Sequence, residues 1–376
     1  MLGKTSLENI RLGGVEVLLL LLIGFMLVQS LRHTPLTIGF FGFRSVALYA
    51  PIYFLTPSFM TTKDDVKKLM RILFLSMGVI ALVGIIQYFM TAVVMEKMGF
   101  SYGEVAFRTT EGHLKSSATL GNPGAFGALI AIFLLVFISN RFTLSSNRLS
   151  GFKRLLGLGF ILLLSVSLIL SFSRISLIGF AVGFLILGLF FSRRTIKYYA
   201  FGLLFVLIVN ALLHNFLLEY LLSSFGLVEH EQGIKSVMER ISIIKMAFSK
   251  FIPSHPFFGS GLGITGAPSL RNESIVPYGY LPMDNYYLKL LLETGIIGTF
   301  LYLSFLGGCI WRGIRNFRRI SDLYFRNLTL GITLGLIALS VINVASTVLE
   351  MPVVNNYFWI LAGLLPALKS IDNRKT

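Results

Sequence analysis

The chain has few charged residues and a single cysteine. Only 13% of its 376 residues are charged, 55% are hydrophobic, and 17 acidic residues stand against 33 basic ones. A water-soluble protein of this length does not need apolar runs that recur from end to end. The lone cysteine, Cys309, excludes an intramolecular disulfide and a cysteine-based metal site. Histidine and acidic residues form no cluster with ligand spacing, so we expect neither a metal nor another cofactor.

Apolar segments of membrane-spanning length are abundant instead. A helix needs about 17 to 25 apolar residues to cross the hydrocarbon core with its backbone hydrogen bonds satisfied internally. Ten segments are predicted to do so: 15–31, 36–55, 72–94, 118–139, 155–171, 175–191, 198–218, 286–310, 328–349 and 353–368. The sequence therefore predicts an all-α polytopic integral membrane protein with about ten transmembrane helices, forming one membrane-embedded domain over residues 1–376. The fifth and sixth segments are nearly continuous, so a helical hairpin and a re-entrant pair both fit.

The net charge of +16 is explained by where the basic residues lie. When the N-terminus is placed in the cytoplasm, most of them fall in short cytoplasmic loops and tails, as the positive-inside rule requires. This distribution favours the hairpin and predicts that both termini are cytoplasmic. It also removes the reason to expect a nucleic acid, and the lipid bilayer is the predicted partner. A signal peptide over the first thirty or so residues is the weaker interpretation, because its small-residue cleavage site is poor.

Two predicted extracytoplasmic segments are long enough to hold a site, 95–117 and 219–284, and the second joins the seventh and eighth spans. The second contains apolar residues spaced for one face of an amphipathic helix, which Pro253 would end. They are Ile234, Val237, Ile241, Ile244, Phe248 and Phe251. Such a helix could lie on the membrane surface or pack on the bundle.

Two arginines lie at unusual depths in the predicted bilayer. Arg174 falls between two apolar spans at the outer boundary, where a guanidinium can bind pyrophosphate through two hydrogen bonds. The alternative is an interfacial arginine that extends toward water. Arg44 lies inside the second span without a nearby acidic residue in the sequence, so we expect it either to pair with an anion from another helix or to face a polar cavity.

Polar residues gather where the eighth span begins. Asp284 and Asn285 occupy the natural N-cap position of a helix starting at Tyr286, and capping alone would explain them. A carboxylate at the membrane surface can also deprotonate or orient a sugar hydroxyl, which makes Asp284 a candidate base and the neighbouring Asn285 a candidate for substrate binding. Further along the helix, Lys289 and Glu293 have the spacing of a pair that neutralises its own charge.

Two further positions are weaker candidates for substrate binding. Asn122 has the place of an N-cap for the fourth span, whose free N–H groups could contact a phosphate. His255 precedes a proline and a run containing Gly259, Gly261 and Gly263, which permits a tight turn near the membrane. The GSGLG run is not a nucleotide-binding motif, because no strand precedes it.

Four motifs in order resemble the O-antigen ligase and polymerase superfamily: GNPGAFGALI, LSFSRISLIGF, MERISIIKMAFSKFIPSHPFFGSGLG and MDNYYLKLLLETGIIG. The resemblance implies a metal-independent glycosyltransferase with a GT-C-like helical fold. Such an enzyme would act on the outer side of the cytoplasmic membrane, on a polyprenyl-pyrophosphate-linked oligosaccharide. It also implies that arginines hold the pyrophosphate, with Arg240 corresponding to the arginine of the long loop. Ligases of the family typically have histidine where this chain has Asp284, which favours a polymerase of O-antigen or exopolysaccharide repeat units.

Two other functions remain open at this point. A ligase would move the finished glycan to a lipid or protein acceptor. A transporter or flippase would also be built from many helices, although the sequence shows no inverted repeats and its polar residues gather at the outer boundary instead of the midplane. A chain-length regulator and a flippase are possible partners through the resemblance alone.

Overall fold

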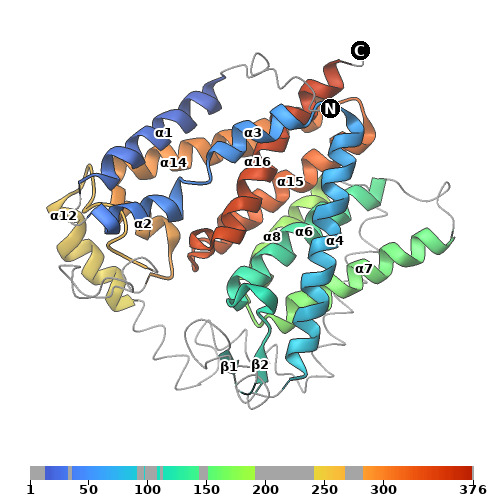
Figure 1. Cartoon of the computed structure of the whole chain (residues 1–376), viewed down its shortest axis with the longest axis horizontal. Helices are drawn as coiled ribbons and strands as arrows, with labels where there is room; N and C mark the ends of the chain where they lie inside the picture. Colours follow the sequence, from blue (N-terminus) through green and yellow to red (C-terminus); the bar gives the residue numbers. More distant parts are fainter. Residues whose placement is uncertain are drawn as a thin grey trace.

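The computed structural model describes residues 13–32, 36–90, 97, 108–110, 113–143, 151–190, 241–266 and 283–374. These residues form a bundle of helices with one hairpin of two short antiparallel strands, β1 (Arg108–Thr110) and β2 (His113–Lys115) (Figure 1). Within this part of the chain, six helical segments are long and apolar enough to cross a membrane, and two apolar helices are shorter. The predicted all-α, polytopic membrane architecture is therefore confirmed.

Helices occupy nine of the ten predicted spans, and the seventh, 198–218, lies outside the described residues. The main helices are α1 (Gly14–Ser30), α2 (Leu36–Val46), α3 (Pro51–Phe59), α4 (Lys63–Tyr88), α6 (Pro123–Thr143), α7 (Gly151–Leu170), α8 (Arg174–Phe190), α14 (Tyr286–Arg319), α15 (Leu323–Ile342) and α16 (Pro352–Asn373). Short helical turns also occur at η2 (Ala118–Leu120), α12 (Ile252–Ser254) and η4 (Val348–Glu350).

Two predicted spans are not the continuous helices that we expected. The second is divided into α2 and α3 by a turn at residues 47–50, because Pro51 lacks the amide hydrogen that an unbroken helix would use. The eighth continues to Arg319 and is broken at Gly295, whose φ of 65° lies outside the helical region. Hydrophobicity alone reveals neither break, because the residues on both sides remain apolar.

The centre of the bundle is formed by α6 and α15, which pack against each other along their length. Side chains of α6 from Ala125 to Val136 are almost all buried, whereas α4 and α7 leave many leucine and isoleucine side chains exposed. The fifth and sixth predicted spans are two separate helices, which fits both the hairpin and the re-entrant pair. They diverge beyond their turn, because α7 packs on α4 and α6 while α8 packs on α15 and α6 (Figure 1).

The polar contacts lie at two ends of the bundle. We call the end at which α6, α8, α14 and α16 begin the loop end, and the other the opposite end. At the loop end, the amide of Tyr286 donates to the carbonyl of Asn343 at the end of α15, 2.9 Å away. At the opposite end, Arg312 of α14 is paired with Glu16 of α1. The candidate site residues that the structure describes all belong to the loop end.

Candidate active site

A Gly-rich loop, residues 255–266, completes the broken helix α14 at the loop end. Gly295 interrupts the helix, so carbonyl groups in the preceding turn lose their intrahelical partners. The amide of Ser260 donates to the carbonyl of Leu292 at 2.8 Å, and that of Gly261 to the carbonyl of Glu293 at 2.9 Å. The loop thus supplies the hydrogen bonds that the helix itself no longer makes.

The same loop also accepts hydrogen bonds from the amides that follow the break in α14. The amides of Ile296 and Ile297 donate to the carbonyls of Pro256 and Phe257, at 2.9 and 3.2 Å. Non-helical backbone at membrane depth is tolerated only where protein or a polar cavity satisfies it, and here both cut ends are bonded to protein. The loop and α14 therefore form one structural unit.

Glycine is required on both sides of this joint. Gly259 and Gly295 both have positive φ angles, of 66° and 65°. A Cβ atom on Gly295 would overlap the carbonyl oxygen of Phe257, and one on Gly259 would lie 2.5 Å from the amide nitrogen of Thr294. Any larger residue would push the loop out of the break.

A buried ionic cluster fastens the end of the loop. Lys289 Nζ lies 2.6 Å from Glu293 Oε1 and 2.8 Å from Glu350 Oε1. The amide and the hydroxyl of Thr265 donate to Glu293 Oε1 at 3.1 and 2.8 Å, and Lys289 Nζ donates to the Thr265 carbonyl at 3.2 Å. The side chains of Lys289 and Glu293 are fully buried, so the predicted pairing of these two residues is confirmed.

The cluster contains two carboxyl groups and one ammonium group. The carboxyl groups thus outnumber the ammonium group by one, in a site that is almost closed to solvent. Glu350 is followed two residues later by the start of α16, and the positive end of that helix dipole favours a carboxylate at this place. The arrangement draws α14, the Gly-rich loop and the α15–α16 connection together around one charge.

Sequence analysis missed Glu350 and Thr265. Glu350 is the one acidic residue between Asp322 and Asp372, within otherwise apolar sequence, and this isolation was a usable signal. Its partner could not be inferred, because Lys289 lies 61 positions earlier in the chain. For Thr265, nothing in the sequence distinguishes it from other loop threonines.

The start of α6 forms the neighbouring part of the loop end. Asn122 caps this helix, because its Oδ1 accepts a hydrogen bond from the amide of Ala125 at 3.0 Å, as predicted. A Cβ atom on Gly124 would lie 3.6 Å from Val348 and 3.8 Å from the hydroxyl of Ser346. The capped end of α6 therefore adjoins the connection that carries Glu350.

Arg174 begins α8 in the same corner. The first turns of α6 and α8 are in close contact, since a Cβ atom on Gly127 would lie 2.8 Å from the hydroxyl of Ser171 and 2.9 Å from that of Ser176. The turn before Arg174 includes Phe172, whose φ of 47° is unusual for a bulky residue. Arg174 is half-buried and stands at the N-terminus of α8, beside the N-terminus of α6.

Asp284 and Asn285 have different roles in the structure. Asn285 Oδ1 accepts from the amide of Leu288 at 2.9 Å and is the N-cap of α14. Asp284 precedes the cap and its side chain is exposed. Helix capping thus accounts for the presence of Asn285. Asp284, which is exposed at the loop end, stays the candidate for a base.

Arg44 is half-buried on α2, beside the Gly-rich loop. A Cβ atom on Gly42 would overlap the backbone of Gly263, and the carbonyl of Ser45 accepts from Asn355 Nδ2 at 2.8 Å. Among the residues described, no hydrogen bond or ion pair joins Arg44 to another residue. The predicted pairing with an anion from another helix is therefore not found in this part of the chain.

The remaining two candidates are less informative. The side chain of His255 is exposed, and its carbonyl accepts from the amide of Gly259 at 2.9 Å, so the structure uses its backbone to form a turn. Arg240 lies outside the described residues. The charge that the loop was expected to bring to the site therefore stays a prediction.

The loop helix before α12 is described from residue 241 onward. Ile243, Met246 and Ala247 pack on the first turns of α14, so this segment packs on the bundle. Ile241 and Phe248, which belong to the predicted apolar face, are 46% and 57% exposed. The described part of the predicted face therefore points away from the bundle, where an apolar surface at the end of a membrane protein can contact lipid.

Comparison with known families matches the segment that builds the loop end. Residues 158–303 match the model of a family described as O-antigen ligase, from within α7 to within α14. Over this segment, the predicted resemblance to the O-antigen ligase and polymerase superfamily is confirmed, and the match supports a membrane function of ligase or polymerase type. It does not distinguish between the two. No curated protein matches the chain.

Proposed function

We propose that this chain is a membrane glycosyltransferase that polymerises polyprenyl-pyrophosphate-linked oligosaccharide repeat units. The proposal is carried by the agreement of two findings. The segment that matches the O-antigen ligase family includes the turn before α8, the Gly-rich loop and the start of α14. Those elements all lie at the loop end, where Arg174 begins α8 and Asp284 stands just before α14.

The donor pyrophosphate binds at the start of α8. A guanidinium forms paired, charge-assisted hydrogen bonds with phosphate oxygens, and the N-termini of α6 and α8 add a favourable dipole. Arg174 is the principal ligand, with Arg240 of the long loop as the second cation. Asn122, Arg44 and His255 are the other proposed contacts with substrate.

Asp284 acts on the acceptor. Its exposed carboxylate takes the proton of a sugar hydroxyl, or orients that hydroxyl, as its oxygen attacks the anomeric carbon of the donor. The new glycosidic bond forms while the bond from the anomeric carbon to the pyrophosphate oxygen breaks. The pyrophosphate leaves as an anion with the electron pair, so it needs stabilisation of charge by arginines and not a general acid.

The topology proposed for this reaction follows the distribution of basic residues. Both termini lie in the cytoplasm, and the loop end faces the outside of the cytoplasmic membrane. A chain-length regulator and a flippase are the partners that such a polymerase would need.

A ligase is the second candidate, because the matching family is described by that activity. In that case the loop end would accept a finished glycan from the polyprenyl carrier and transfer it to a lipid or protein. Asp284, at the position where ligases of the superfamily typically have histidine, favours the polymerase.

The test uses purified full-length protein in detergent, with a polyprenyl-pyrophosphate-linked repeat unit as the sole substrate. We expect a ladder of polymer on a gel, which is lost in the Asp284→Ala and Arg174→Ala variants. The matched controls are Asp64→Ala and Arg71→Ala, two exposed charges on α4 that should leave the ladder unchanged.

Three other outcomes would contradict the proposal. A ladder that persists in the Asp284→Ala and Arg174→Ala variants would mean that these residues are not the site. Transfer that requires a separate acceptor would identify a ligase. Movement of the lipid-linked glycan across proteoliposomes without any new glycosidic bond would identify a transporter.

A further inference from the structure

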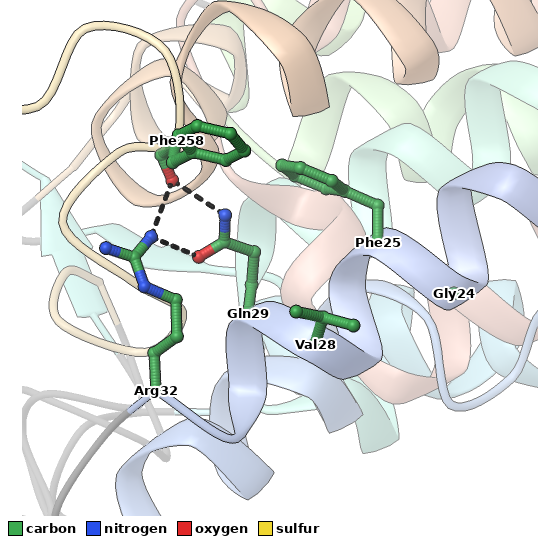
Figure 2. Close-up of a pocket in the computed structure, with 6 residues that line it drawn as sticks. All are labelled: Gly24, Phe25, Val28, Gln29, Arg32 and Phe258. Carbon is green, nitrogen blue, oxygen red and sulfur yellow. Dashed lines mark hydrogen bonds between the residues drawn. The ribbon is translucent and has the colours of Figure 1, made fainter.

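An apolar groove runs along the outside of α1, away from the corner that contains Arg174. Its lining residues are Gly24, Phe25, Val28, Gln29, Arg32 and Phe258, and its volume is about 430 Å³. Figure 2 shows the rings of Phe25 and Phe258 at one side and the guanidinium of Arg32 at the end of the groove. The site thus combines an apolar trough with one cationic end.

The groove lies on an exposed apolar surface of α1. The 17 residues of α1 give a helix of about 26 Å, close to the roughly 30 Å hydrocarbon core of a bilayer. Apolar side chains on its outer surface are exposed, among them Leu20, Leu27 and Val28. Arg32 follows two residues after the helix ends, so a helix α1 that crosses the hydrocarbon core would hold Arg32 at the level of the lipid headgroups.

The polar end of the groove is held in place by hydrogen bonds. Gln29 Nε2 donates to the carbonyl of Phe258 at 2.9 Å, and Arg32 Nη1 donates to Gln29 Oε1 at 2.9 Å (Figure 2). The Nε and Nη2 atoms of Arg32 donate to no residue in the part of the chain that is described. An arginine so oriented presents two donors to a phosphate group.

The groove is joined directly to the broken helix. Phe258 belongs to the Gly-rich loop, and the preceding carbonyl, of Phe257, accepts from the amide of Ile297 below the break. On the same side, a Cβ atom on Gly298 would lie 2.7 Å from the ring of Phe25. From this joint, the first part of α14 leads over roughly 15 Å to Asp284.

We infer that this groove binds the isoprenoid chain of the acceptor, a second polyprenyl-pyrophosphate-linked glycan, with its pyrophosphate against Arg32. The inference rests on the proposed function, because a polymerase joins two lipid-linked chains and needs two places for their tails. The donor binds beside α8, which packs on α6 and α15, whereas α1 packs on α14 and α2. An acceptor anchored at Arg32 extends its sugars along α14 toward Asp284.

The test is photocrosslinking of purified full-length protein in phosphatidylcholine nanodiscs. The probe is a polyprenyl pyrophosphate with a diazirine in its isoprenoid chain, and mass spectrometry locates the labelled peptides. We expect label on the α1 peptide that contains Phe25 and Val28. Val28→Trp, which fills the groove, and Arg32→Gln, which removes the cation, should each lower that label about tenfold.

Matched controls lie on exposed surfaces away from the groove. Val17→Trp adds the same ring to an exposed position of α1, and Arg71→Gln removes an exposed arginine of α4, so both should keep the label. The inference is overturned if Val28→Trp and Arg32→Gln are labelled like the unchanged protein. It is also overturned if a diazirine-bearing phosphatidylglycerol labels the groove equally and competes with the polyprenyl probe.

Failure of this inference is distinguishable from failure of the proposed function. If the unchanged protein makes a polymer ladder but its α1 peptide is not labelled, the groove is not the acceptor site and the polymerase assignment stands. If no lipid-linked repeat unit yields a ladder and transfer needs a separate acceptor, the polymerase assignment fails, and with it the acceptor role of the groove.

Discussion

The two ends of the bundle use charged residues in different ways. At the opposite end, Arg312 of α14 pairs with Glu16 of α1 and also donates to the hydroxyl of Tyr53 at 2.6 Å. Nearby, Lys63 pairs with Asp322, which in turn caps α15 by accepting from the amide of Phe325 at 3.1 Å. Each of these contacts ties two helices together and balances its charge locally.

The loop end shows the contrary pattern. Lys289 faces two carboxyl groups, α14 is broken, and a half-buried arginine begins α8. Features that cost stability gather at this end, while the opposite end closes the bundle with balanced pairs. Strained and charge-rich arrangements persist where function requires them, so the contrast supports the proposal that the loop end is the active end.

Removal of the buried cation tests the contrast between the two ends of the bundle most strongly. Lys289→Met leaves two buried carboxyl groups without their counter-ion, and breaking a buried pair in this way costs about 3–5 kcal/mol. We expect a strong loss of folded protein, measured by thermal unfolding in detergent. Replacing Lys289, Glu293 and Glu350 together with Met, Gln and Gln should recover part of that stability.

The control for the buried cation is Lys63→Met at the opposite end. Because Lys63 and Asp322 are partly exposed, we expect the loss to stay within about 1 kcal/mol. Equal losses at the two ends would contradict the contrast between them.

A second variant tests the joint between the Gly-rich loop and α14. Gly295→Ala places a methyl group against the carbonyl of Phe257 at a positive φ angle, so we expect a loss of about 2 kcal/mol or more. Gly307→Ala in the same helix meets no atom within 4 Å and should stabilise by about 0.5–1 kcal/mol. Thermal unfolding of the two variants side by side measures the difference. If both variants lose stability or both gain it, Gly295 is not confined by the Phe257 carbonyl as described.

A third pair separates capping from chemistry at the start of α14. Asn285→Ala removes the cap and should cost about 1 kcal/mol of stability while polymer still forms. Asp284→Ala changes an exposed residue and should leave the melting temperature nearly unchanged while the polymer ladder disappears. A ladder assay and a melting curve on each variant test this. If the Asn285→Ala variant is fully folded but makes no ladder, the asparagine contacts substrate.

The smallest expected effect is a pH dependence at the opposite end. Burial opposes ionisation of Asp322, but hydrogen bonds from Lys63 and from the amides of Phe325 and Tyr324 outweigh it and lower the pKa of this carboxyl. The stabilisation is therefore complete above the unfolded pKa of about 3.9 and is lost as the pH falls through the lower folded pKa.

The measurement compares melting temperatures of the unchanged protein and Asp322→Asn across that range. We expect the unchanged protein to be more stable at neutral pH, and the difference to shrink below about pH 4. A difference that stays constant with pH would show that the charge of Asp322 does not contribute.

Most of the architecture could be predicted from the sequence. Span length and apolar composition located α1, α4, α6, α7, α8, α15 and α16, because the membrane forces every spanning segment to be apolar and internally hydrogen-bonded. Local polar signals were also reliable at Asn122, which caps α6, and at Lys289 and Glu293, which pair one turn apart. These interactions join residues close in the chain, so spacing alone reveals them.

The site could be predicted only in part. Pro51 signals the division between α2 and α3, but the break at Gly295 lies in a sequence that reads as continuous apolar helix. Likewise, the sequence does not show whether Asp284 or Asn285 caps α14, because this depends on the backbone angles of the two residues. The candidates Arg174 and Asp284 were identified by their place at span boundaries, and the ladder assay tests whether they act on substrate.

A multi-pass helical membrane protein with its polar signals at one boundary can be inferred from the sequence, because a bilayer imposes composition and length on each span separately. Three features depend instead on how the helices pack: the Gly-rich loop supplies the hydrogen bonds missing at the break in α14, Glu350 joins Lys289, and the groove on α1 ends at Arg32 beside Phe258. Each of these contacts joins segments far apart in the chain. Their partners are chosen by the packing of whole helices, and local sequence does not encode that packing.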